Sequence, residues 1–347
     1  MSSPLEMTEA GVWLAQGSLL ATAIVPIFVG AFRSVKSLRE QLTSTGKVPK
    51  RMTQTEAAMN PLICSCVLFG LYILLKLFSK EHVSLLLSVP ITVLIVDDLA
   101  HKISPLINKL MKPLTILLGA SHYHLYFLST NNKDGNTMKK IFAWDFTCTD
   151  LLAWSAGIGV WYLTQKHWLA NNLMVTALAI ISIEQDHLNK VKTGCIMMGG
   201  LFFYDIFWVF TTDVMTTVVM SLDAPMKLVF PKDLLENGLG AKNMGMLGSG
   251  DIVIPGMFVA LMLRYDYSLK RGTHFYFWTT FLAYICGLVM TIVACNNWKH
   301  SQLTLLYLVP ACLGAPILMA AIRGDLSSMF SYADYSEEEE EGVEESN

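Results

Sequence analysis

Long apolar segments recur along the whole chain of 347 residues, and they constrain its fold more than any other feature. A helix that crosses a bilayer needs about 20 consecutive, mostly apolar residues. Six segments meet this requirement and three more are shorter or interrupted, which predicts an all-α polytopic membrane protein with nine transmembrane helices. The six clear segments are 11–32, 58–78, 194–222, 244–263, 273–295 and 302–322, and the three weaker ones are 83–100, 150–165 and 168–185.

The composition excludes several other classes of protein. Only 15% of the residues are charged, whereas a soluble chain carries roughly 25%. Lys and Arg number 25 against 28 Asp and Glu, so the chain has no broad basic face and we expect no nucleic-acid partner. The seven cysteines lie mostly within apolar segments, which is not the pattern of a disulfide framework. None of the eight histidines forms a His-Glu-x-x-His motif, so we assign no metal and no cofactor.

The distribution of positive charge predicts the orientation. Loops on the cytosolic side of a membrane protein are enriched in Lys and Arg. If nine spans alternate and the amino terminus lies outside the cytosol, 18 of the 25 Lys and Arg residues fall on the cytosolic side, mainly in loops 33–57 and 101–149. The amino terminus is therefore expected on the lumenal or extracellular side, and the carboxyl terminus in the cytosol.

The same pattern divides the chain into four parts. Residues 1–100 hold the first three helices, and 150–322 hold the other six. Between them, the hydrophilic segment 101–149 contains two β-prone runs around Asn-Lys-Asp-Gly-Asn, which predicts a small cytosolic β-hairpin. Residues 323–347 are rich in Glu and poor in apolar residues, which predicts an acidic, disordered cytosolic tail.

Two aspartates lie where a charge is costly. Asp205 and Asp251 are each inside an apolar segment, and an ionisable side chain at bilayer depth costs at least a few kcal/mol. Their two helices are predicted to be antiparallel and joined by only about 22 residues, so the carboxyls can face each other. Two such carboxyls share one proton, because both cannot ionise at short distance. One can then accept a proton from an attacking water while the other polarises a peptide carbonyl, as in aspartic proteases.

The neighbours of these aspartates fit the same chemistry. Tyr204 precedes Asp205, and its hydroxyl can bond to a substrate or to the carboxyl pair. Gly248, Ser249 and Gly250 precede Asp251, and glycines without side-chain bulk loosen a helix and admit a substrate backbone. We therefore predict Asp205 and Asp251 to be catalytic and these neighbours to bind or support the substrate.

Together, the Tyr-Asp pair and the Gly-Ser-Gly-Asp motif resemble the GxGD intramembrane aspartyl proteases, which include the presenilins and the signal peptide peptidases. Presenilins carry a long cytosolic loop between the two catalytic spans and have the opposite orientation, whereas here the loop is short and predicted to be lumenal. Longer strings are similar to the signal peptide peptidase family, and the likeness extends from the first span to about residue 332. These strings are 160–173, 192–210, 224–239 and 243–258.

The resemblance implies a fold, a location and partners. It implies the nine-span fold and a multi-pass protein of the endoplasmic reticulum membrane with a lumenal amino terminus. The implied activity is an endopeptidase that cleaves leftover signal peptides and type II membrane proteins within their transmembrane segments. The expected partners are these transmembrane peptides and the lipid bilayer, with a homo-oligomer or an endoplasmic-reticulum quality-control complex as further expectations.

The chain departs from the family at one motif. The family has Pro-Ala-Leu at the start of the ninth span, near the catalytic pair, where this chain has Leu303, Thr304 and Leu305. Replacing the proline restores a backbone N–H and favours a continuous helix. We expect these three residues to line the substrate groove.

Two other interpretations stay open from the sequence alone. A proton-coupled or cation-coupled carrier or channel also uses facing aspartates within a membrane. The altered Pro-Ala-Leu position also allows a catalytically weak relative that binds membrane peptides without cutting them.

Overall fold

The computed structural model describes residues 9–45, 51–110, 122–130, 138–147, 157–238, 243–298 and 304–334. The chain forms two compact units, the first made of Met1–Ser88 with Val175–Asn347 and the second of Val89–Met174. The boundary between the units falls within the helix Lys80–Leu110, which continues beyond the end predicted at residue 100. The predicted division of the chain into four parts stays a prediction.

The first unit is a helical bundle with two short sheets. Strand β1 (Arg51–Met52) pairs in parallel with β4 (His187–Leu188), and β5 (Lys227–Pro231) pairs antiparallel with β6 (Met244–Gly248). Two helices, α3 (Lys80–Leu110) and α7 (Trp168–Gln185), are divided between the two units. The helices wholly in the first unit are α1 (Glu9–Thr45), α2 (Gln54–Leu77), α8 (Val191–Phe210), α9 (Val214–Ser221), α10 (Leu234–Asn237), α11 (Gly250–Ser268), α12 (Phe275–Trp298), α13 (Thr304–Arg323) and α14 (Leu326–Ser331).

The second unit contains the segment predicted to form a hairpin. Strands β2 (His122–Thr130) and β3 (Met138–Thr147) pair antiparallel, with a register shift between Phe127 and Leu128. The residues between these strands lie outside the described residues. The short helix α6 (Ile158–Gln165) covers the second half of the weak segment 150–165, and the first half also lies outside the described residues.

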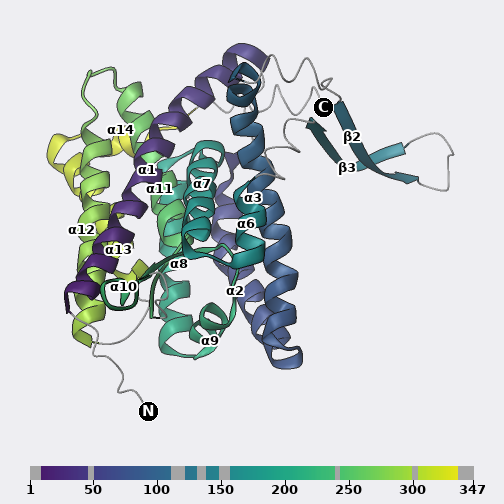
Figure 1. The fold of residues 1–347 in the computed structure, drawn as a ribbon. Helices are drawn as coiled ribbons and strands as arrows, with labels where there is room; N and C mark the ends of the chain where they lie inside the picture. The colour runs from purple at the N-terminus through teal and green to yellow at the C-terminus, as the bar shows by residue number, and fades with distance from the viewer. Residues whose placement is uncertain are drawn as a thin grey trace. The chain divides into compact units, whose positions relative to one another are not determined.

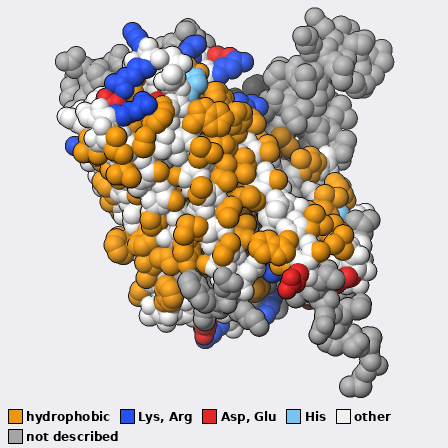
Figure 2. Space-filling model, turned by 90° about the vertical axis from the view of Figure 1, so that its left-hand side faces the viewer, with side chains coloured by type: hydrophobic (Ala, Val, Ile, Leu, Met, Phe, Trp, Pro, Cys, Tyr) orange, Lys and Arg blue, Asp and Glu red, His pale blue; other side chains and the backbone are white. Residues whose placement is uncertain are grey.

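The apolar helices fit a polytopic membrane protein. Six helices of the described chain are long and apolar enough to cross a bilayer: α1, α2, α3, α8, α12 and α13. Figure 2 shows hydrophobic side chains over most of one face of the molecule, with Lys and Arg side chains gathered mainly toward one end. Exposed apolar side chains on α12 and α13, such as Trp278, Leu282, Met290 and Leu318, would face water in a soluble protein. A bilayer removes this conflict.

The sixth predicted span, 194–222, is wrong in its second half. Helix α8 ends at Phe210, and α9 begins at Val214 after a short break. The break contains Thr211, Thr212 and Asp213, which are weak helix formers. The Thr212 hydroxyl donates to the Trp208 carbonyl oxygen at 2.9 Å, so a side chain bonds to the last turn of α8.

The seventh predicted span, 244–263, begins as a strand rather than a helix. Residues Met244–Gly248 form β6, whose register with β5 runs from Lys227 opposite Gly248 to Pro231 opposite Met244. Gly245 and Gly248 disfavour a helix here, since each glycine costs about 1 kcal/mol relative to alanine in a helix interior. Helix α11 therefore begins at Gly250 and continues to Ser268, beyond the predicted end.

Close contacts at small residues join α1, α7 and α11. A Cβ atom built on Gly30 would lie 2.9 Å from Cβ of Ile183, and one built on Gly256 would overlap Cδ1 of the same residue. Figure 1 shows α1 running diagonally across α11 and α12. Ile183 is fully buried, so this contact fixes where α1 crosses the bundle.

A buried arginine ties the carboxyl-terminal segment to the bundle. Arg264, which directly follows the predicted span 244–263 and counts among the 18 residues expected on the cytosolic side, lies inside α11 and is 4% exposed. Its guanidinium pairs with Asp334 at 2.9 Å and donates to Ser34 Oγ at 2.7 Å and to the Leu188 carbonyl oxygen at 3.2 Å.

The predicted disordered tail, 323–347, is therefore structured in its first part. It contains α14, and the Asp325 that precedes α14 pairs with Arg271 at 2.5 Å and 2.9 Å. Hydrogen bonds from Arg271, and then from Tyr276, lower the pKa of Asp325 to about 2. Residues 335–347, which include the Glu-rich run, lie outside the described residues.

The contact at Gly30 predicts a steric effect on stability. A Gly30→Ala substitution places a methyl group against the rigid Cβ of Ile183, so we expect a loss of about 1–3 kcal/mol, measured by thermal unfolding in detergent. Gly17→Ala in the same helix is the matched control, because nothing lies within 4 Å of its added methyl group. That control should leave stability unchanged or raise it. Equal melting temperatures for the two variants would contradict the packing described here.

Candidate active site

Asp205 is held on the buried face of α8. Its side chain is 3% exposed, and its Oδ2 atom has no hydrogen-bond partner among the described residues. The opposite side of α8 packs on α2, where a Cβ on Gly200 would lie 2.6 Å from Pro61. The indole of Trp208 donates to Ser65 Oγ at 3.0 Å, which fixes the rotation of α8. The Asp205 carboxyl therefore lies on a fixed face of the bundle.

Asp251 lies in the first turn of α11, directly after the strand-to-helix junction. The Ser249 backbone N–H donates to the Met226 carbonyl oxygen at 2.9 Å, which joins the junction to the segment before β5. The Asp251 carboxyl lies beside Gly248, where an added Cβ would be 3.4 Å from Oδ2. It also interacts with the Gly248 backbone N–H. The strand end and the first helical turn together position this carboxyl.

The two aspartates come together because α8 and α11 are antiparallel and pack closely. A Cβ on Gly194 would lie 2.7 Å from the Phe258 ring, which marks a close approach of the two helices. From that contact, Asp205 lies further along α8 and Asp251 lies back toward the start of α11. The two carboxyls interact electrostatically. The structure thus places the two predicted catalytic residues in one site.

The first turn of α13 points at both carboxyls. The Leu305 backbone N–H interacts with Asp205, and the Thr304 hydroxyl interacts with Asp251. The first N–H groups of a helix have no acceptor within the helix, and its dipole favours negative charge there. This helix end therefore stabilises an anion at the aspartate pair. Leu303, the first residue of the altered motif, lies outside the described residues.

The other predicted supporting residues lie close to the pair. Tyr204 is half-buried, interacts electrostatically with Asp205, and its ring centroid lies 6.5 Å from that of Trp208. Gly248 ends β6, Ser249 follows it, and Gly250 begins α11. The predicted glycines therefore form the end of a strand and its junction with a helix, rather than a loosened helix.

Sequence reasoning missed Tyr284 on α12. This side chain is fully buried, its hydroxyl has no hydrogen-bond partner among the described residues, and it interacts electrostatically with Asp251 and Cys312. One turn along, a Cβ on Gly287 would lie 3.2 Å from Ala311 and from Leu308, so α12 and α13 are in close contact here. A tyrosine in the middle of an apolar span is itself a buried polar group, and that signal could have identified it.

The described residues contain no group of three or more His, Cys, Asp or Glu side chains that could hold a metal ion. The groups that the site brings together are two carboxyls, hydroxyls and backbone N–H donors. Such a set can exchange protons with a water and with a carbonyl group.

A membrane bundle with two interacting aspartates on neighbouring helices has the architecture of the intramembrane aspartyl proteases. The sequence model of the family described as "Signal peptide peptidase" matches residues 44–336. The chain belongs to the signal peptide peptidase family and is an intramembrane protease.

Individual relatives agree with the family model. The chain is 50% identical to the mouse signal peptide peptidase over 327 residues, which cover 94% of this chain and 84% of the mouse protein. It is 49% identical to the human signal peptide peptidase over 341 residues, which cover 98% of this chain and 88% of the human protein. A more distant relative, intramembrane protease 2 of Caenorhabditis elegans, is 36% identical over 265 residues, covering 68% of this chain and 57% of that protein.

The unpartnered hydroxyl of Tyr284 predicts opposite effects on stability and activity. Burying a hydroxyl without a partner costs about 1–3 kcal/mol, so Tyr284→Phe should raise the melting temperature or leave it unchanged. If the hydroxyl serves the Asp251 side of the site, the same variant should cleave a peptide substrate about tenfold more slowly.

Tyr265→Phe is the matched control, because its hydroxyl is also buried but belongs to the opposite end of α11. That variant should keep its cleavage rate. Full activity in Tyr284→Phe would remove Tyr284 from the site.

Proposed function

We propose that Asp205 and Asp251 form the catalytic dyad of an endopeptidase that cuts transmembrane segments of signal peptides and type II membrane proteins. The observation that carries this proposal is the pairing of two carboxyls from α8 and α11 beneath the first turn of α13. The names of the mouse and human relatives support signal peptides as the substrate class. The family assignment favours this function over a carrier or channel.

The proposed mechanism uses one proton shared by the two carboxyls. The ionised carboxyl accepts a proton from a water that attacks the peptide carbonyl carbon, and the protonated carboxyl donates to the carbonyl oxygen. The carboxyls then exchange roles, and a proton passes to the amine that leaves. The unpartnered Oδ2 of Asp205 supports this scheme, because it leaves an oxygen free to bind water or substrate. The Tyr204 hydroxyl is proposed to bind the substrate beside Asp205.

A substrate helix must unwind before it is cut, because its peptide carbonyls are otherwise hydrogen-bonded within the helix. Strand β6 leads directly into the Gly-Ser-Gly-Asp segment and, within the described residues, pairs only with β5. An unwound substrate can add to such an edge through backbone hydrogen bonds. Gly248 and Gly250 carry no side chains that would block its approach to Asp251. We propose that this edge of β6 forms one side of the substrate groove, which Thr304 and Leu305 also line.

We further propose nine spans, in which α6, α7 and α11 complete the path of the six long apolar helices. The excess of Lys and Arg in loops 33–57 and 101–149 supports a lumenal amino terminus and a cytosolic carboxyl terminus. The β5–β6 sheet is then on the lumenal side. The resemblance to signal peptide peptidases supports the endoplasmic reticulum membrane as its location, and a homo-oligomer or a quality-control complex there as its assembly.

The direct test is cleavage of a synthetic signal peptide by purified full-length protein. Asp205→Asn and Asp251→Asn should each lower the rate by about a hundredfold or more, the usual size of general acid–base catalysis. Asp213→Asn is the control, because Asp213 lies between α8 and α9 and makes no cap hydrogen bond with its side chain. Helix-weakening residues placed in the substrate near its scissile bond should speed cleavage. Undiminished cleavage by Asp251→Asn would overturn the proposal, and uptake of ions into liposomes without cleavage would favour a carrier.

The altered motif gives a second prediction. Thr304 occupies the place of the family alanine and adds a hydroxyl beside Asp251. Thr304→Ala should lower kcat about threefold to tenfold, the size expected for one hydrogen bond, and Thr304→Ser should keep the wild-type rate. A Thr304→Ala variant that cleaves faster than the wild type would instead identify this chain as a catalytically weak relative, in which the altered motif lowers the activity.

A further inference from the structure

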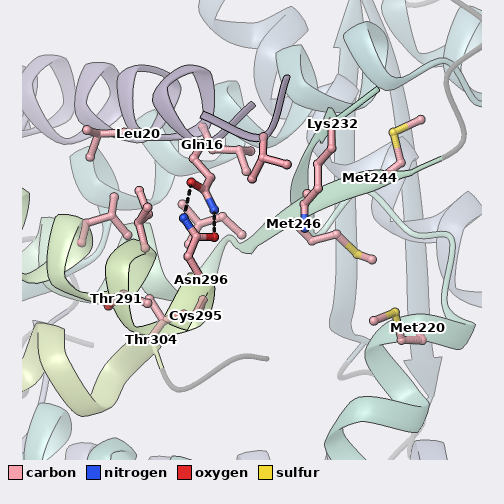
Figure 3. Close-up of a pocket in the computed structure, with 16 residues that line it drawn as sticks. Gln16, Leu20, Met220, Lys232, Met244, Met246, Thr291, Cys295, Asn296 and Thr304 are labelled. Atoms are coloured by element: carbon pink, nitrogen blue, oxygen red, sulfur yellow. Dashed lines mark hydrogen bonds between the residues drawn. The ribbon is translucent and has the colours of Figure 1, made fainter. Parts of the chain in front are cut away.

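An open cavity of about 440 Å³ lies between α1, α12, β6 and the first turn of α13 (Figure 3). Most of its lining is apolar, and Met220, Met244 and Met246 contribute flexible side chains to it. Gln16 and Asn296 close one wall, because their side-chain amides exchange two hydrogen bonds of 2.6 Å and 3.0 Å between α1 and α12. Its volume and apolar lining suit part of a peptide chain.

One part of the cavity adjoins the aspartate pair. Thr304 lines the cavity and interacts with Asp251, and Leu247 lines it from the penultimate position of β6. The cavity and the proposed catalytic site therefore share a wall. A peptide that lies along β6 at the dyad continues into the cavity.

Another part of the cavity carries a single positive charge. Lys232 is the one charged residue among the described residues that line it, and no acidic side chain joins it there. The Lys232 backbone N–H donates to the Asn243 carbonyl oxygen at 2.7 Å, which fixes the residue beside the start of β6. Its side chain passes Gly245, where an added Cβ would lie 3.4 Å from Cε. Figure 3 shows this side chain running toward Met246.

The carboxyl group of Asp233, the residue after Lys232, is already hydrogen-bonded to other groups. Asp233 accepts a hydrogen bond from the Asn243 backbone N–H at 3.2 Å and one from the Asn237 side chain at 3.0 Å. No ion pair with Lys232 occurs among the described residues. The ammonium group is therefore available to an anion that enters the cavity.

We propose that this cavity receives the lumenal end of the substrate and that Lys232 pairs with its C-terminal carboxylate. The inference rests on the proposed function and on a lumenal β5–β6 sheet. A signal peptide that has been cut from its precursor ends in a new carboxylate on the lumenal side. An uncut precursor has an uncharged peptide bond at the same position. Lys232 thus distinguishes the leftover peptide from a precursor that is still intact.

The length of β6 fits this arrangement. Asp251 lies seven residues beyond Met244, where β6 begins next to Lys232. An extended peptide beside the strand advances about 3.3 Å per residue. A substrate that ends roughly five to seven residues after the scissile bond therefore brings its carboxylate to Lys232.

The test compares two synthetic signal peptides that differ only in having a C-terminal carboxylate or a C-terminal amide. Binding is measured by fluorescence anisotropy to the full-length Asp251→Asn variant in detergent, so that turnover does not interfere. The carboxylate peptide should bind about fivefold to tenfold more tightly than the amide, as expected for one charge-assisted contact in a partly exposed site. Lys232→Gln should abolish this preference, and Lys232→Arg should retain it.

Lys80→Gln is the matched control, because Lys80 is exposed at the start of α3 and does not line the cavity. It should leave the preference unchanged. Equal binding of the two peptides, or a preference that survives Lys232→Gln, would overturn the inference and leave a lipid chain as the better occupant of the cavity. Absence of cleavage by the wild-type protein would instead overturn the proposed function, since the binding comparison does not depend on catalysis.

Discussion

The buried guanidinium of Arg264 is the interaction on which the arrangement of this bundle depends. A charge removed from water is tolerated only when its hydrogen-bonding groups are satisfied, and removal of one partner typically costs about 3–5 kcal/mol. Here the partners come from α1, from β4 and from the segment after α14. One side chain of α11 therefore holds three distant parts of the chain around the helix that carries Asp251.

At the reactive end of α11, buried polar atoms lack the hydrogen-bond partners that the Arg264 guanidinium has among the described residues. The Arg264 guanidinium has three hydrogen-bond acceptors, whereas Oδ2 of Asp205 and the hydroxyl of Tyr284, near Asp251, have no partner among the described residues. Unpaired buried groups are costly, and they persist where a ligand or a water completes them. A buried charge with satisfied hydrogen bonds in the scaffold and polar atoms without partners at the reactive end are a common division between scaffold and active site.

Much of the bundle was predictable because long apolar runs have few alternatives. The helices expected at 11–32, 58–78, 273–295 and 302–322 are all present, each with somewhat different ends. The aspartate pair was also predictable, because acidic residues within apolar membrane segments are rare and indicate a functional site. The family, the protease activity and the membrane-spanning character are confirmed by the comparisons.

The errors have a different physical origin. Residues 244–248 are apolar in either conformation, and only their pairing with β5 makes them a strand, so hydropathy could not separate the two. Arg264 was placed outside the membrane because the predicted span ends at residue 263, and its partner Asp334 lies 70 residues away in a segment that composition marked as disordered. Contacts between distant parts of the chain determine both the strand at 244–248 and the burial of Arg264. In the same way, the sequence does not show which carboxyl Thr304 or Tyr284 faces.

As the proposed substrate-binding edge, strand β6 has a broader consequence for the range of peptides that this protein can accept. A free strand edge offers amide and carbonyl groups at a regular spacing, and every amino acid presents the same groups in return. Recognition of this kind requires that the peptide adopt an extended conformation, and it depends little on the side chains of the peptide. A single enzyme can then dispose of many membrane remnants that share no common motif.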